Sequence, residues 1–323
     1  MQIPRYWAEA SAPAKKRSRH RVNVRRWGWS DDSPAAAQAH AQQRLQEALA
    51  CMGKPGEPRA RESHPRGYNG ADGLPICEEI LDTRGSAVLT RNSYGAHCLN
   101  TPDVLFADVD YANRYKGLGM GGVIVLLFLC GISFMAGWAS TAYAIGLALV
   151  MLLLFSAYQN WAHRPAVQHR RALRRIHRFA RQHPDWGLRV YQTPAGLRVL
   201  VTHQPFMPDA PEVLALFDAL RVDPLYRRMC QVQQCFRARV SAKPWRMGIR
   251  SSIMPNVRIK WPVPPQYAQH RATWVANYEK NARQYAACRF IESLGRPEVD
   301  PGVQAVLDWH DALSQARSAL ALA

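Results

Sequence analysis

Residues 104–111 read VLFADVDY, an apolar run that ends in two carboxylates, and the fold that we predict is built around this stretch. A short apolar run of this kind is typical of a buried β-strand. Side chains alternate between the two faces of a strand, so Asp108 and Asp110 are predicted to share one face.

A stretch without any charged side chain or histidine follows this strand, from Gly117 to Ala162. A helix that crosses a membrane needs about 20 apolar residues, so the stretch predicts two spanning helices, near Leu118–Trp138 and Thr141–Trp161. Arginines flank the pair and none lies in its turn, which predicts an integral protein of a bacterial inner membrane, with both termini cytoplasmic and the lipid bilayer as a partner. The alternative is a helical hairpin buried in a soluble core.

The sequence after this stretch alternates between helical and strand patterns. Residues 167–182 and 211–220 predict helices, and residues 188–192, 197–202 and 235–240 predict strands. Together with the strand at 104–111, the order strand, helix, strand, strand, helix, strand predicts an α+β fold with an RRM/ferredoxin-like βαββαβ core. The two-helix transmembrane hairpin is then an insertion after the first core strand.

This interpretation divides the chain into six segments. They are a mobile basic tail at 1–20, an N-terminal cytoplasmic αβ segment at 21–103, the first core strand at 104–116, the transmembrane helical hairpin at 117–162, the remainder of the RRM-like cytoplasmic core at 163–250, and a proline-rich connector with C-terminal helices at 251–323.

Composition narrows the classes of function. The chain has 323 residues and 42 Lys+Arg against 24 Asp+Glu, a formal net charge of +18. Hydrophobic residues make up 48%, which excludes a chain disordered throughout. Seven cysteines occur without a C-x-x-C motif, so neither a zinc ribbon nor a thioredoxin site is indicated. A basic protein of this kind is predicted to face anionic lipid, or to bind a nucleotide or nucleic acid.

The acidic pair is the first candidate for chemistry. Asp108 and Asp110 at a strand end offer the oxygen ligands that Mg²⁺ or Mn²⁺ prefers, and we assign them as candidate catalytic and metal-binding residues. The alternative is that these carboxylates pair with Arg198 or Arg237 and have a structural role.

Basic side chains on the neighbouring predicted strands are candidates for phosphate binding. The predicted turn from Thr193 to Gly196 precedes Arg198, while Arg237 and Arg239 alternate along the last strand and Lys243 follows it. Guanidinium and ammonium groups recognise phosphate, so these six residues are the predicted nucleotide or phosphate site.

The run FADVDY, a helix and then RVYQTPAGLRVLVTH resembles the palm of the archaeo-eukaryotic primase superfamily, over roughly residues 103–245 without the insertion. The resemblance implies an RRM-like core, a metal motif at Asp108 and Asp110, and a nucleotide-binding turn at Thr193 and Gly196. Arg198 occupies the position of that family's histidine. The strand order also resembles that of nucleotide cyclase palms. The block RNSYG (91–95) with LNTPDVLFADVD (99–110) resembles a bacterial family of two-span membrane proteins for which we know no established activity.

Two functions remain open at this point. The first is a membrane-tethered palm-like domain that binds metal together with nucleotide or nucleic acid and catalyses nucleotidyl or phosphoryl transfer. The second is a non-enzymatic membrane-anchored binding or scaffold protein. A transporter or channel is less favoured, because the two predicted spans carry no ionisable residue. Such a function would require a homo-oligomer to form the pathway.

Overall fold

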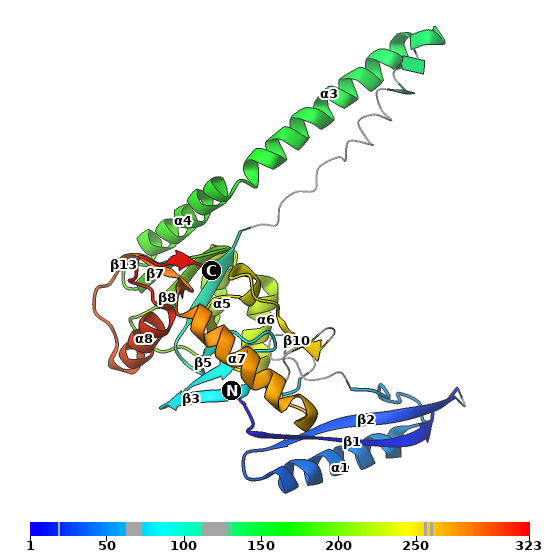
Figure 1. Ribbon diagram of the computed structural model, residues 1–323. Helices are drawn as coiled ribbons and strands as arrows, with labels where there is room; N and C mark the ends of the chain where they lie inside the picture. The colour runs from blue at the N-terminus through cyan, green and yellow to red at the C-terminus, as the bar shows by residue number, and fades with distance from the viewer. Residues whose placement is uncertain are drawn as a thin grey trace.

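The computed structural model describes residues 1–18, 20–62, 73–111, 128–129, 131–132, 134–137, 139–254, 257–258 and 261–323. In this part of the chain the fold is α+β, with a central body, an N-terminal unit beside it and a long helix that projects away (Figure 1).

The N-terminal unit is a two-stranded antiparallel ribbon with one helix packed on it. Strand β1 (Tyr6–Lys15) pairs with β2 (Arg21–Ser30), and helix α1 (Pro34–Cys51) covers one face. Helix α1 begins after Ser33, whose side chain accepts a hydrogen bond from the Ala36 N–H. A Cβ added at Gly28 would lie 2.1 Å from Ala41 N, so only glycine lets the helix approach β2 this closely. Half of the segment predicted as a mobile basic tail, residues 6–15 of 1–20, is therefore strand β1.

The central body contains two four-stranded antiparallel sheets. The first has the order β13-β7-β8-β6, and the second has the order β3-β4-β5-β9. The strands of the first are β6 (Phe106–Asp110), β7 (Gly187–Thr193), β8 (Gly196–Val201) and β13 (Arg289–Gly295). Those of the second are β3 (Glu79–Arg84), β4 (Ala87–Arg91), β5 (His97–Thr101) and β9 (Phe236–Arg239).

Helices surround these sheets and close the core. They are α4 (Pro165–Gln182), α5 (Pro211–Leu220), α6 (Pro224–Gln233), α7 (Ala268–Ala282) and α8 (Pro301–Ser314). The shorter elements are η2 (Pro244–Arg246), η3 (Pro265–Tyr267), β10 (Ser252–Met254), β11 (Val257–Arg258), β12 (Tyr285–Ala286) and β14 (Ala321–Leu322). One large apolar core joins both sheets with α4, α5, α6 and α8, and Phe106, Ile176 and Phe236 are fully buried in it.

The predicted βαββαβ core is wrong in its last strand. Strand β6 pairs with β8 and β8 pairs with β7, but β9 forms its ladder with β5 in the other sheet. The Tyr226 hydroxyl lies between β6 and β9, donating to the Phe106 carbonyl at 2.9 Å and accepting from the Arg237 N–H at 3.3 Å. This side chain occupies the place where a direct ladder would have joined the two sheets. Residues 289–295, which lie in the segment 251–323 where only a connector and C-terminal helices were predicted, form β13 instead.

The predicted transmembrane hairpin is contradicted as well. Helix α3 (Ala139–Ala162) matches the second expected span and projects from the body (Figure 1), while most of the first span lies outside the described residues. Within the described residues, no helix combines the length and apolarity that crossing a bilayer requires. The inner-membrane location derived from the hairpin is contradicted by the same finding.

Candidate functional site

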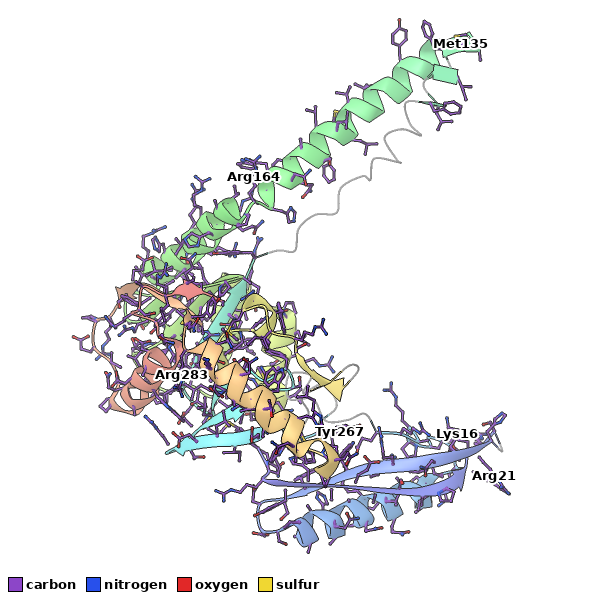
Figure 2. All side chains as sticks on the ribbon, in the orientation of Figure 1. Lys16, Arg21, Met135, Arg164, Tyr267 and Arg283 are labelled. Atoms are coloured by element: carbon purple, nitrogen blue, oxygen red, sulfur yellow. The ribbon has the colours of Figure 1, made fainter. Side chains whose placement is uncertain are left out.

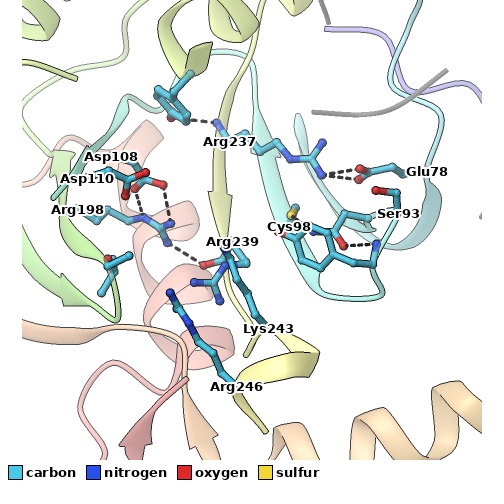
Figure 3. Close-up of a pocket in the computed structure, with 15 residues that line it drawn as sticks. Glu78, Ser93, Cys98, Asp108, Asp110, Arg198, Arg237, Arg239, Lys243 and Arg246 are labelled. Atoms are coloured by element: carbon cyan, nitrogen blue, oxygen red, sulfur yellow. Dashed lines mark hydrogen bonds and ion pairs between the residues drawn. The ribbon is translucent and has the colours of Figure 1, made fainter. Parts of the chain in front are cut away.

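A pocket of about 290 Å³ opens where the two sheets meet, between β6 and β8 on one side and β9 on the other (Figure 3). Loop residues before β5 and after β9 complete its wall. It is lined by Glu78, Asn92, Ser93, Tyr94, Cys98, Asp108, Asp110, Thr193, Ala195, Arg198, Tyr226, Arg237, Arg239, Lys243 and Arg246.

All but one of the residues predicted for the site line this pocket. They are Asp108, Asp110, Thr193, Arg198, Arg237, Arg239 and Lys243. The exception is Gly196, which lies opposite Asp110 in the ladder between β6 and β8. A Cβ at Gly196 would come within 2.3 Å of the Val109 carbonyl oxygen, so this glycine permits the close strand approach that holds Asp110 at the pocket.

Asp108 and Arg198 form the ion pair at the base of the pocket. They are directly opposite each other in the ladder, and the guanidinium donates from Nε to Oδ1 at 2.7 Å and from Nη2 to Oδ2 at 3.1 Å. Arg198 is buried, and its Nη1 donates to the Arg239 carbonyl at 2.9 Å. Both oxygens of Asp108 therefore accept hydrogen bonds from one guanidinium. This is the pairing with Arg198 that the sequence offered as the alternative to metal binding.

A second buried ion pair lies on the opposite wall. Arg237 Nη2 contacts both oxygens of Glu78, at 2.6 and 2.7 Å, and the side chains are 4% and 2% exposed. Thr90 donates its hydroxyl to the same carboxylate at 2.7 Å. Arg237 Nη1 is buried and has no hydrogen-bond partner among the described residues. A buried N–H group without an acceptor costs free energy, so this donor is suited to a ligand that supplies one.

Three further cations lie at the pocket, and none forms an ion pair with an Asp or Glu side chain among the described residues. Arg239 Nη1 donates to the Ser241 oxygen at 2.5 Å and to the Ala323 oxygen at 3.4 Å. Arg239, Lys243 and Arg246 approach one another at the pocket (Figure 3). Burial, and then the charges of Arg239 and Arg246, lower the pKa of Lys243 below its ordinary value. Burial and Arg239 likewise lower the pKa of Arg246, and its buried Nη1 is also without a hydrogen-bond partner there. The pocket therefore holds mutually repelling positive charges that an anion would stabilise.

Asp110 differs from Asp108 in its surroundings. Its side chain is exposed and forms no ion pair among the described residues. Exclusion of water by the surrounding protein, and then the neighbouring Asp108, raise the pKa of Asp110 above its ordinary value. Asp110 is thus the carboxylate of the pair that remains available to a ligand.

The donor set does not favour a metal centre. Within the described residues, no group of three or more His, Cys, Asp or Glu side chains is placed to hold a metal ion. Of the two candidate ligands, Asp108 is already bound by Arg198, which leaves one free carboxylate. A Mg²⁺ or Mn²⁺ site accordingly stays a prediction, and no chemical step is derived through it.

An aromatic pair borders the cations. The ring of Tyr94, which lines the pocket, packs edge-on against Trp245 at 5.2 Å, and Lys243 Nζ lies 5.4 Å from the Trp245 ring centroid. Burial and then Cys98 raise the pKa of Tyr94 to about 12. A neutral phenol ring therefore forms part of the wall at physiological pH.

Sequence reasoning missed several residues of this wall. Glu78 lies 30 residues before Asp108, Arg246 follows the predicted Lys243 by three residues, and Tyr94 belongs to the RNSYG block, where Asn92 Oδ1 accepts from the Tyr94 and Ala96 N–H groups. The run Asn92-Ser93-Tyr94-Gly95 indicates a turn, which was the available signal. Nothing in the sequence indicated that this turn would face the Asp108 strand.

Comparison of the chain with protein-family models, with curated proteins and with solved structures returned no match. The resemblance to the primase palm therefore stays a prediction, and the argument for function depends on the geometry of the pocket.

Proposed function

We propose that this pocket binds the phosphate group of a nucleotide. The observation that carries the proposal is the cluster of Arg239, Lys243 and Arg246, three cations that form no ion pair with Asp or Glu among the described residues. Charge-assisted hydrogen bonds from such groups are the usual means of holding phosphate oxygens. A phosphate at this position would also supply acceptors for the unpaired Nη1 groups of Arg237 and Arg246.

The aromatic pair supports a nucleotide over a simple phosphate ester. Tyr94 presents a neutral ring beside the cations, and the Trp245 side chain is 53% exposed next to it. Base–aromatic stacking contributes about 1–3 kcal/mol per base, which is enough to discriminate a nucleotide from a sugar phosphate. A pocket of about 290 Å³ is at the low end of ligand-site volumes, so it accommodates part of a mononucleotide rather than an extended ligand.

The buried Asp108–Arg198 pair favours a binding role over catalysis. Nucleotidyl transfer of the two-metal type requires carboxylates free to coordinate metal, and both oxygens of Asp108 accept from Arg198. The function that we propose is therefore that of a non-enzymatic nucleotide-binding protein. Phosphoryl or nucleotidyl transfer remains the second candidate, favoured by the available Asp110 carboxylate beside the cations.

Isothermal titration of the full chain with ADP, ribose 5-phosphate and inorganic phosphate tests the proposal. We expect ADP to bind most tightly, and Lys243→Ala or Arg246→Ala to weaken all three ligands at least tenfold. Lys54→Ala and Arg178→Ala remove exposed cations outside the pocket, serve as matched controls and should bind as the wild type does. Equal affinities of the pocket variants and the controls would contradict the proposal.

A further inference from the structure

The N-terminal ribbon has two faces of opposite character. On the inner face, Ala8, Ala10, Ala12 and Ala14 of β1 pack with Val22 and Val24 of β2 in the apolar cluster that α1 covers. The alternation of a strand places the intervening residues on the other face. Towards the loop end of the ribbon, these outer residues lie in opposed pairs, Ser11 with Arg25, Pro13 with Asn23, and Lys15 with Arg21, and all but Pro13 are polar or basic. Arg25 also donates to the Glu62 carbonyl.

The tip of this ribbon is a concentrated and exposed positive charge. Lys15, Arg17, His20 and Arg21 are exposed, and Figure 2 shows Lys16 and Arg21 at the end of the unit farthest from the central body. None of these side chains forms an ion pair within the described part of the chain. The nearby Glu57 carboxylate accepts instead from the main-chain N–H groups of Arg17 and Gly53.

The last residue pair of the ribbon, next to its loop, destabilises the folded unit. Lys15 and Arg21 are directly opposite each other, and like charges in opposed positions of an antiparallel pair destabilise it. A two-stranded ribbon is also marginal by itself, and here α1 supplies the packing that keeps it ordered. The ribbon thus holds cations that repel one another in a fixed, projecting position. A bound polyanion would reduce this repulsion.

We propose that the outer face and tip of this ribbon bind double-stranded DNA. The B-DNA major groove is about 12 Å wide and admits a two-stranded ribbon, whereas the major groove of A-form RNA is too narrow for side chains to read. Lys15, Arg17 and Arg21 contact phosphates, and Asn23, whose amide can pair with a base edge, lies on the face that enters the groove. This site is separate from the pocket and does not depend on the proposed nucleotide binding.

Fluorescence anisotropy of a labelled 20-base-pair duplex with the full chain tests the proposal. We expect binding at about 50 mM salt that weakens steeply by about 200 mM, because each phosphate contact contributes about 0.9 to the slope of log K against log salt. The double charge reversal Lys15→Glu with Arg21→Glu should reduce affinity at least tenfold and make that slope shallower by about two. Both side chains are exposed, so the unit should stay folded, which circular dichroism and thermal melting verify.

The matched control changes the same charge elsewhere. Arg174→Glu with Arg178→Glu reverses two exposed arginines on α4 and should leave DNA affinity within about twofold of the wild type. An equal loss in this control would show that binding follows net charge and would overturn the proposal. Absence of binding at 50 mM salt, or tighter binding to a duplex RNA of the same length, would overturn it too. Lys243→Ala should not alter DNA affinity, so failure of the pocket proposal can be distinguished from failure of this one.

Discussion

Asp108 and Arg198 are directly opposite each other on β6 and β8, and two hydrogen bonds of 2.7 and 3.1 Å join their side chains. The pair connects β6, which precedes the charge-free stretch, with the β7–β8 hairpin that follows it, across 90 residues of sequence. This contact decides whether Asp108 is a metal ligand or a structural partner, and its consequences can be measured.

Removal of Asp108 should destabilise the fold far more than removal of Asp110. Asp108→Ala leaves the buried Arg198 charge without its partner, and we expect the free energy of unfolding to fall by about 3 kcal/mol, near the lower end for buried pairs because Asp108 is 28% exposed. Asp110→Ala should change it by less than about 0.5 kcal/mol. Urea denaturation of both variants measures the difference, and equal effects would contradict the structural assignment.

Divalent metal alone should not stabilise the protein. The two carboxylates offer only one free ligand, so we expect millimolar Mg²⁺ or Mn²⁺ to leave the melting temperature unchanged in the wild type and in Asp110→Ala. Thermal melting with and without each ion checks this. A rise in melting temperature that is present in the wild type and lost in Asp110→Ala would instead support the metal site predicted from the sequence.

Nucleotide affinity should depend on pH through Lys243. Burial and the charges of Arg239 and Arg246 lower the pKa of this ammonium group, and a bound phosphate would favour its protonated form. Above the lowered pKa, Lys243 is neutral in the free protein and must take up a proton when ADP binds. We therefore expect the Kd for ADP to rise as the pH increases towards 10.5, the ordinary pKa of a lysine.

The variant Lys243→Gln separates this residue from other titrating groups. We expect weaker ADP binding at every pH and a nearly flat dependence over the range in which the wild type weakens. Lys54→Gln, an exposed lysine of the N-terminal unit, should keep the wild-type profile. A Lys243→Gln profile parallel to that of the wild type would assign the proton to another group.

Acid should weaken the attachment of α7 through Glu279. Burial by itself raises the pKa of this carboxyl, but hydrogen bonds and charge from His97 and Arg91 outweigh burial and hold it at about 2. The pKa in the folded state is below the ordinary 4.5, so the stabilisation is fully present above pH 4.5 and is lost as the pH falls towards 2.

Glu279→Gln should accordingly lower the free energy of unfolding by about 1–2 kcal/mol at neutral pH, with the difference from the wild type shrinking below pH 4.5. Urea denaturation at several pH values measures this. Glu298→Gln, at an exposed pair with Arg296, should have little effect at any pH. If Glu279→Gln remains as much less stable than the wild type at pH 2 as at neutral pH, the ionised carboxylate of Glu279 is not the source of the stabilisation.

Local patterns predicted the strands that carry the pocket better than they predicted their connections. The VLFADVDY run and the turn at Thr193–Gly196 indicated β6 and the β7–β8 hairpin, because apolar runs and turn residues act over short distances. The pairing of β9 with β5 depends on contacts such as Arg237 with Glu78, 159 residues apart, for which a single sequence gives no signal.

The N-terminal strand and the transmembrane prediction show two other limits. Strand β1 reads YWAEASAPAK, and alanine has low strand propensity, so pairing with β2 and packing on α1 decide its conformation. The charge-free stretch was interpreted from its length, its apolar composition and its flanking arginines, whereas no helix in the described part of the structure is long and apolar enough to cross a membrane.

Tyr226 lies at the break between the two sheets, where the pocket opens. Had β6 and β9 shared a continuous ladder, their side chains would have packed as neighbours in a single eight-stranded surface, with no room between them. One phenol inserted at the seam holds the two halves apart at a fixed width, while its hydroxyl satisfies a carbonyl on one side and an amide on the other. The pocket thus lies along the break between the two sheets, and the Tyr226 hydroxyl is the group that bridges this break.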